Sequence, residues 1–245
     1  MKIACFGSGI ATTEAVLALG ASTEFRKATK NMAFACAAVE DLFQSLPQDW
    51  VRDESAKMGI VVGTAEGELS TTFQFLKRLE SQGARPFLFQ SSLHNATLGF
   101  LTQKYNLRGP GITVSGTYHS GEEALDTAYS LLCANTVASV IVLGVDGLVE
   151  GVESEFSARM PKPVVLRAGA GAVLLANPSE INLPPLGFVE MGPSKVTKDL
   201  ASFENYYRAN AVEILALSLR GGCPESLRLT KPDGSVSCLQ WSKDL

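Results

Sequence analysis

The chain has 245 residues, of which 46% are hydrophobic and 19% are charged, a balance that excludes intrinsic disorder and is typical of a globular protein with a large core. Its formal net charge of −4 argues against nucleic acid or an anionic membrane surface as a partner. No apolar run reaches the length of a membrane-spanning helix. The five cysteines are odd in number and mostly lie in apolar stretches, as buried thiols of a reducing compartment do. We therefore expect a cytoplasmic protein.

Strand-type and helix-type patterns alternate along the first three quarters of the chain. Short apolar runs predict strands buried on both faces, and apolar residues at helical spacing predict helices. In chain order we expect a strand at residues 2–6, a helix at 25–46, a strand at 58–63, helices at 71–79 and 95–105, a strand at 112–115, a helix at 120–134, a strand at 139–144 and a β-pair at 164–167 and 171–176. This alternation indicates an α/β fold with a mostly parallel, five-stranded sheet between helices.

The pattern changes in the last quarter of the chain. A strand is expected at residues 186–191, a long helix at 201–220 and a hairpin at 226–241 around a Pro-Asp-Gly turn. We expect one domain over residues 1–192, followed at 193–245 by a helix and a hairpin that pack on the same core.

The most informative segment is residues 95–121, which read NATLGFLTQKYNLRGPGITVSGTYHSG. It resembles the β-ketoacyl synthases, in which an Asn-containing helix leads through a Leu-Arg-Gly-Pro turn to a strand, and an elbow after that strand carries the nucleophilic cysteine just before Ser-Gly. Further landmarks occur in the family's order, namely Gly7-Ser8-Gly9, the alanine-rich run 33–38, Gly63-Thr64, Leu143-Gly144-Val145-Asp146 and the Gly-Ala-rich run 169–175. The resemblance covers about residues 1–192 and implies a single N-terminal-type half of a thiolase-like fold.

Two departures from the family pattern bear on chemistry. Tyr118 stands where the family has its cysteine, and a phenol with a pKa near 10 cannot replace a thiolate at neutral pH without strong activation. The family's second half supplies two histidines, or a histidine and an asparagine. The only histidines here are His94 and His119, and both fall within the first half. We therefore expect no condensation of acyl groups by this chain alone.

This combination is similar to the chain-length-factor type of subunit. It is also similar to the short β-ketoacyl synthase-like N-terminal domain proteins of aryl-polyene and related type II polyketide or fatty-acid gene clusters. The resemblance implies a heterodimer with a catalytic ketosynthase, and contact with an acyl carrier protein through that complex. A homodimer is the corresponding state of the isolated chain.

The resemblance also implies where the partner binds. The strand before the elbow would pair with its counterpart in the partner through Ile112, Thr113, Val114 and Ser115. The partner's acyl tunnel would be bordered by Leu88, Ser92 and Leu93. In the full family a second half covers one face of the sheet, so the helix at 201–220 is expected to take that place here.

The residues around Tyr118 have both structural and chemical interpretations. Ser120 followed by Glu123 predicts a capping box at a helix start. We prefer this to a nucleophilic pair of Ser120 and His119, because no acid is expected to orient the imidazole. His119 is interpreted as lining a pocket or an interface, ahead of a role as general base. Tyr118 either plugs the vacated nucleophile site or lines a pocket as a hydrogen-bond donor, and its size favours the plug.

Cofactor and metal sites find little support in the sequence. Gly7-Ser8-Gly9 follows a strand, but Thr12 replaces the third glycine of a dinucleotide-binding fingerprint. No pair of cysteines or histidines has the spacing of metal ligands. We expect neither a cofactor nor a metal.

Two other functions stay open beside the partner subunit. One is a self-associating acyl-carrier or acyl-thioester binding protein without a ketosynthase partner. The other is a minimal acyltransferase or hydrolase that uses Ser120 or His119.

Overall fold

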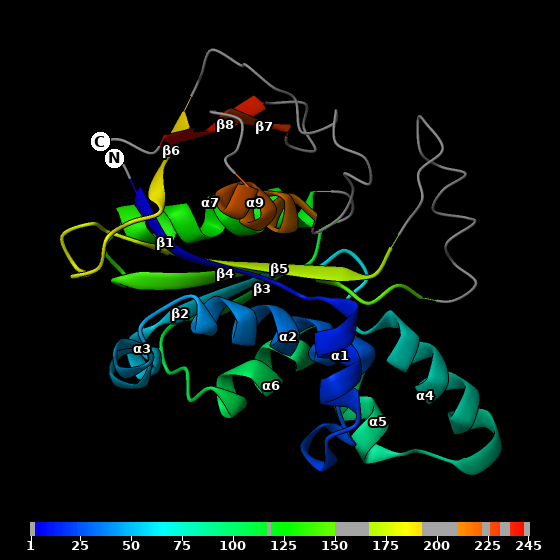
Figure 1. Ribbon diagram of the computed structural model, residues 1–245. Helices are drawn as coiled ribbons and strands as arrows, with labels where there is room; N and C mark the ends of the chain where they lie inside the picture. Colours follow the sequence, from blue (N-terminus) through cyan, green and yellow to red (C-terminus); the bar gives the residue numbers. More distant parts are fainter. Residues whose placement is uncertain are drawn as a thin grey trace.

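Eight strands form one sheet among the residues that the structure describes, which are 3–116, 119–149, 167–192, 210–221, 226–230 and 236–242. Figure 1 draws this computed structural model as a ribbon. In sheet order the strands are β3 (Gly111–Val114), β2 (Gly59–Gly63), β4 (Ser139–Asp146), β5 (Gly169–Ala176), β1 (Ile3–Ile10), β6 (Gly187–Gly192), β8 (Val236–Ser242) and β7 (Ser226–Thr230).

The sheet is mixed in direction. β2 is parallel to both β3 and β4, whereas β5 runs antiparallel to β4 and β1, and β6 runs antiparallel to β1 and β8. The predicted α/β fold is confirmed, but the sheet has eight strands of mixed direction where a mostly parallel, five-stranded one was expected. A run of small and apolar residues buried on both faces, such as β5, has the same sequence pattern in either direction. Its antiparallel orientation is therefore not visible in the sequence.

Helices cover both faces of the sheet, and α4 (Leu69–Gln82) and α5 (Pro86–Ser91) project to one side (Figure 1). One face carries α1 (Thr13–Gly20), α2 (Lys30–Gln44), α3 (Gln48–Glu54) and α6 (Ala96–Lys104), and the other carries α7 (Ser120–Cys133) and α9 (Asn210–Gly221). Successive strand residues alternate between the two layers. Ile60 and Leu174 pack in the α2 layer, whereas Val61 and Val173 pack in the layer of α7 and α9.

Helix boundaries follow local chemistry more closely than the apolar pattern does. The helix predicted at residues 25–46 begins only at Lys30, because the hydroxyl of Thr29 accepts the N–H of Met32 at 3.1 Å and caps the helix. α1 is not among the expected helices. Its apolar residues at 15–19 are consecutive, so they do not form the spaced stripe that predicts a helix. In the described part of the chain, no helix has the length and apolar character needed to cross a membrane.

The described part of the C-terminal helix, α9, packs on the second face of the sheet. Val212, Leu215 and Ala216 are buried against the strands. A Cβ on Gly171 of β5 would lie only 2.3 Å from Glu213 Cα, so the strand and the helix touch through their backbones. Residues 201–209 of the predicted helix, and residues 2 and 164–166 of predicted strands, lie outside the described residues.

Arg220, in the last turn of α9, connects this helix to β1. Arg220 Nη2 donates to Ser8 O at 2.7 Å and forms an ion pair with Asp41 Oδ2 at 2.6 Å. Asp41 Oδ2 also accepts the N–H of Ile10 at 2.7 Å. The contact joins β1, α2 and α9, which are far apart in the sequence.

Candidate functional site

The carboxyl ends of the parallel strands meet at one edge of the sheet, where a buried aspartate holds two loops together. Asp146 Oδ1 accepts hydrogen bonds from Thr64 Oγ1 at 2.9 Å, Ala65 N at 2.9 Å and Glu66 N at 3.0 Å. Thr64 Oγ1 in turn accepts from Gly67 N at 2.8 Å. The segment after β2 and the end of β4, both of them family landmarks, are thus joined by hydrogen bonds beside the elbow.

The elbow itself joins β3 to α7. The fully buried Ser120 donates its hydroxyl to Gly116 O at 2.6 Å and accepts from Gly116 N at 3.2 Å. The helix begins at Ser120, and its N-cap residue, His119, makes no side-chain capping bond. The predicted capping box is therefore wrong, because Ser120 lies one residue too far along to cap and its hydroxyl bonds back to Gly116. A Cβ on Gly63 would lie 2.4 Å from Ser120 O, so the backbone of β2 lies in direct contact with the elbow.

His119 pairs with a carboxylate that the sequence analysis overlooked. Its Nδ1 lies 3.3 Å from Glu122 Oε1, and the side chains are 25% and 2% exposed, respectively. The hydrogen bond to Glu122 raises the pKa of His119, with burial opposing the shift. Burial raises the pKa of Glu122, with the bond from His119 opposing it. The expectation that no acid orients the imidazole is wrong, and the i,i+3 spacing at a helix start was the available signal.

This arrangement does not make the pair of Ser120 and His119 that an acyltransferase would need. The serine hydroxyl is buried and bonded to Gly116, while His119 Nδ1 faces Glu122. A nucleophile and its base must lie within hydrogen-bond reach of each other. Ser120 is therefore held as part of the elbow, whereas Glu122 orients the His119 imidazole.

The second histidine lies at the end of β3. Ser115 Oγ and His94 Nδ1 are 3.0 Å apart, and both residues are exposed. Gly67 allows this placement, because a Cβ there would lie 2.5 Å from His94 Nδ1 and its φ is +54°. The contact joins the segment before α6 to the predicted partner strand.

The predicted partner-binding residues fall into two groups. Ile112, Thr113 and Val114 are half-buried in β3, the outermost strand at its end of the sheet, and Ser115 follows that strand. Tyr118, predicted to stand at the vacated nucleophile position, lies outside the described residues.

The second group lies around α5. Leu88 is half-buried, Ser92 donates its hydroxyl to Phe89 O at 2.7 Å, and Leu93 is exposed. Leu93 directly precedes His94, whose contact with Ser115 places it near the end of β3. The two predicted groups therefore lie near one another at the carboxyl end of β3.

Exposed apolar side chains on α4 and α5 form a surface that the sequence analysis did not single out. They are Phe73, Leu76, Leu79, Phe87 and Phe89. Clustered exposed apolar side chains mark interaction sites in soluble proteins. Periodicity placed a helix at 71–79 but could not say whether its apolar stripe faces the core or the outside.

Metal chemistry has no support from the arrangement of ligands. Within the described ranges, no group of three or more His, Cys, Asp and Glu side chains could hold a metal ion.

A comparison with protein families settles which family this fold represents. The family described as "Beta-ketoacyl synthase, N-terminal domain" matches residues 49–189, which is more than half of the chain. The chain belongs to this family. A search of curated proteins finds no match to it.

Solved structures agree with that family in fold. A ketosynthase in complex with its chain length factor from Xenorhabdus doucetiae is similar at 18% identity, with a TM-score of 0.64 and 99% of each chain covered. The ishigamide ketosynthase/chain length factor is similar at 14% identity and a TM-score of 0.76, over 98% of this chain and 99% of that one. A type II polyketide ketosynthase in complex with its acyl-carrier protein is similar at 12% identity and a TM-score of 0.78, with 99% of each chain covered. At these identities the likeness establishes the thiolase-like ketosynthase fold.

Proposed function

We propose that this member of the β-ketoacyl synthase family is a non-catalytic, chain-length-factor-like subunit that pairs with a catalytic ketosynthase. What supports the proposal is the resemblance of residues 95–121 to the family's motif, by which Tyr118 would stand at the nucleophile position. A phenol at neutral pH is protonated and is a poor acyl acceptor. The fold is that of proteins whose structures include ketosynthase and chain length factor assemblies, which supports a role in such an assembly.

The partner surface that we propose consists of β3 and the exposed apolar side chains of α4 and α5. An outermost strand offers unpaired backbone N–H and C=O groups that a second strand can bind. Phe73, Leu76 and Phe89 are about half exposed, and burying such side chains against a partner is favourable. Leu88, Ser92 and Leu93 would then border the partner's acyl tunnel.

The finer assignments belong to the same proposal. We assign the pair to polyketide biosynthesis of the aryl-polyene type or to fatty-acid biosynthesis, in the cytoplasm, with an acyl carrier protein delivered to the complex. A homodimer is the state that we assign to the chain without its partner. Residues 1–192 would be the ketosynthase-like domain, and residues 193–245 an appendage that completes its core.

The chemical half of the proposal is tested by activity. The isolated chain, incubated with malonyl and acyl carrier proteins, should neither release CO2 nor gain an acyl group by intact mass. The Tyr118→Cys variant should remain inactive, because the family's histidine pair is not among His94 and His119. Condensation product formed by the isolated chain, with contaminating synthase excluded, would contradict the non-catalytic role.

A further inference from the structure

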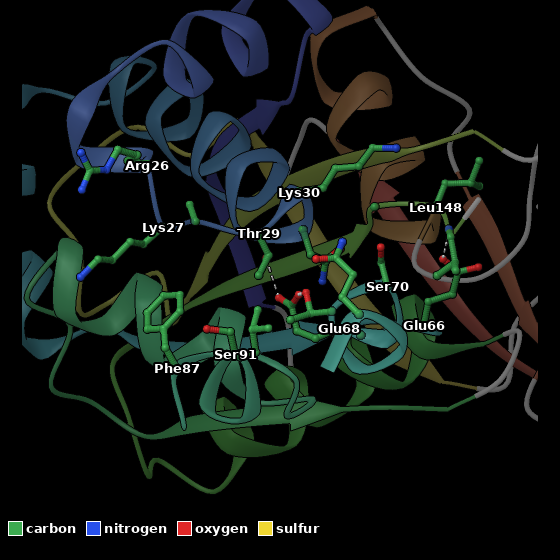
Figure 2. Close-up of a pocket in the computed structure, with 18 residues that line it drawn as sticks. Arg26, Lys27, Thr29, Lys30, Glu66, Glu68, Ser70, Phe87, Ser91 and Leu148 are labelled. Atoms are coloured by element: carbon green, nitrogen blue, oxygen red, sulfur yellow. Dashed lines mark hydrogen bonds between the residues drawn. The ribbon is translucent and has the colours of Figure 1, made fainter. Parts of the chain in front are cut away.

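A pocket lies beside α4 and α5 and shares Phe87 and Leu88 with the surface that we propose for the partner. It has a volume of about 340 Å3 and lies between the start of α2, the loop after β2, α5 and the loop after β4. Figure 2 shows Arg26 and Lys27 on one side of Thr29. Lys30 lies on the other side of Thr29, and Glu66 and Glu68 lie across the pocket from these basic residues. Three exposed basic side chains therefore lie around the pocket, and two buried carboxylates line it.

We call Glu66, Glu68 and Asn31 the polar floor. Glu68 is buried and accepts three threonine hydroxyls, from Thr29 at 2.9 Å, Thr97 at 2.6 Å and Thr71 at 3.3 Å. Burial raises the pKa of Glu68, and these hydroxyls oppose the shift.

The other carboxylate of the floor, that of Glu66, is also buried. Its Oε2 accepts the N–H of Val149 at 3.1 Å. Two buried carboxylates therefore face a cavity that is large enough for a small molecule.

Asn31 adds an acceptor that the protein does not satisfy. The residue is 4% exposed and lines the pocket. Its Nδ2 donates weakly to Thr97 Oγ1 at 3.5 Å, whereas its Oδ1 is buried and has no hydrogen-bond partner within the described residues. A buried acceptor without a donor costs about 1–3 kcal/mol, so this position favours a ligand that brings an N–H group.

We call Arg26, Lys27 and Lys30 the basic mouth. Among the described residues none of the three has a carboxylate within ion-pair distance, and Lys27 Nζ lies 5.5 Å from the centre of the Phe87 ring. The first turn of α2, which begins at Lys30, adds the partial positive charge of a helix N-terminus. An anion is thus attracted to the mouth and repelled from the floor.

We propose that this pocket binds a small zwitterion, with its phosphate or carboxylate group at the basic mouth and its ammonium group at the polar floor. A simple anion would meet buried carboxylates, and a simple cation would have to pass three positive side chains. A molecule with both charges satisfies the two ends together. This inference does not depend on the proposed pairing with a ketosynthase.

The test uses isothermal titration calorimetry on the isolated full chain, with aminoalkyl phosphates as probes. 2-Aminoethyl, 4-aminobutyl and 6-aminohexyl phosphate vary the distance between the charges, and 6-aminohexanoate replaces phosphate by carboxylate. At least one of the four should bind at one site per chain, about 10-fold or more tighter than inorganic phosphate or butylamine, since a charged hydrogen bond contributes about 1.5–3 kcal/mol. The tighter of the phosphate and carboxylate probes identifies the anionic group.

Matched variants locate the binding. Arg26→Ala/Lys30→Ala should weaken the best probe about 10-fold. Arg52→Ala/Lys57→Ala, which makes the same charge change on exposed side chains that do not line the pocket, should leave it unchanged. Asn31→Ala tests the floor without touching a carboxylate and should also weaken binding. Saturable binding by none of the four probes, equal binding of inorganic phosphate, or equal weakening in both paired variants would overturn the proposal.

Discussion

The central strands of the sheet are covered on both faces, whereas the edge of the sheet formed by β3, here called the β3 end, is only partly covered. β4 and β5 are buried along their full lengths, with α2 on one face and α7 and α9 on the other. β3 is at best half-buried, and α4 and α5, which follow β2 in the chain, expose phenylalanine and leucine side chains. The centre is thus completed by the chain's own C-terminal helix, whereas the β3 end keeps apolar surface on which a partner would gain the most burial.

Deleting the helix that covers the central strands should lower the stability of the fold most. Deleting residues 198–245 removes α9 and exposes the face of β5 and β1 beneath it, and the buried Val212, Leu215 and Ala216 contribute on the order of 5 kcal/mol. That is comparable with the whole stability of a domain. We expect insoluble protein, or protein that is soluble only beside a co-expressed ketosynthase. A monomer with cooperative thermal unfolding after this deletion would mean that the sheet is covered in some other way.

Changing the β3 end should abolish association and spare the fold. Val114→Lys places a charge in the strand that we propose pairs with the partner. Light scattering should report loss of the dimer, and circular dichroism an unchanged fold. Leu17→Lys is the matched control, because Leu17 is exposed on α1, outside the proposed surface. An unchanged dimer in Val114→Lys would argue against β3 as the interface.

A methyl group added between β5 and α9 should lower the stability of the fold moderately. In Gly171→Ala the new methyl group would lie 2.3 Å from Glu213 Cα, so the helix must move. We expect a loss of about 2 kcal/mol, or roughly 4–8 °C in Tm. Gly99→Ala is the control, since nothing lies within 4 Å of its Cβ, and it should be neutral or slightly stabilising. Equal Tm values for the two variants would show that α9 does not touch β5 closely.

The pair of His119 and Glu122 offers the smallest and most local test. In Glu122→Gln the imidazole loses its carboxylate partner, so its pKa should fall, which NMR titration can follow because only two histidines are present. His94→Gln assigns the signals. A raised folded-state pKa stabilises the fold below the unfolded pKa of histidine, and this contribution is lost as pH rises through the folded value. Stability of the wild type should therefore decline more steeply than that of Glu122→Gln over that range, whereas an unchanged His119 titration would rule the pair out.

Much of the fold could be predicted because its signals are local. The apolar runs of β2 and β4 and the helical spacing of α7 place those elements within one or two residues, and the landmarks from residue 95 to 121 identify the family. The sequence could not reveal the direction of β5, since burial on both faces erases directional information. It also could not reveal that Ser120 turns back to Gly116 or that the apolar stripe of α4 faces outward. The first depends on the backbone conformation of the elbow, although the two residues are only four apart. The second depends on how α4 packs against the rest of the chain.

The central claim, that this chain completes another subunit, is tested most directly by native mass spectrometry after co-expression with a full-length ketosynthase encoded nearby in the same genome. We expect a one-to-one heterodimer that carries out condensation, and loss of that heterodimer with Val114→Lys but not with Leu17→Lys. Separate, uncomplexed proteins, together with a ketosynthase whose activity is the same with and without this chain, would contradict the claim.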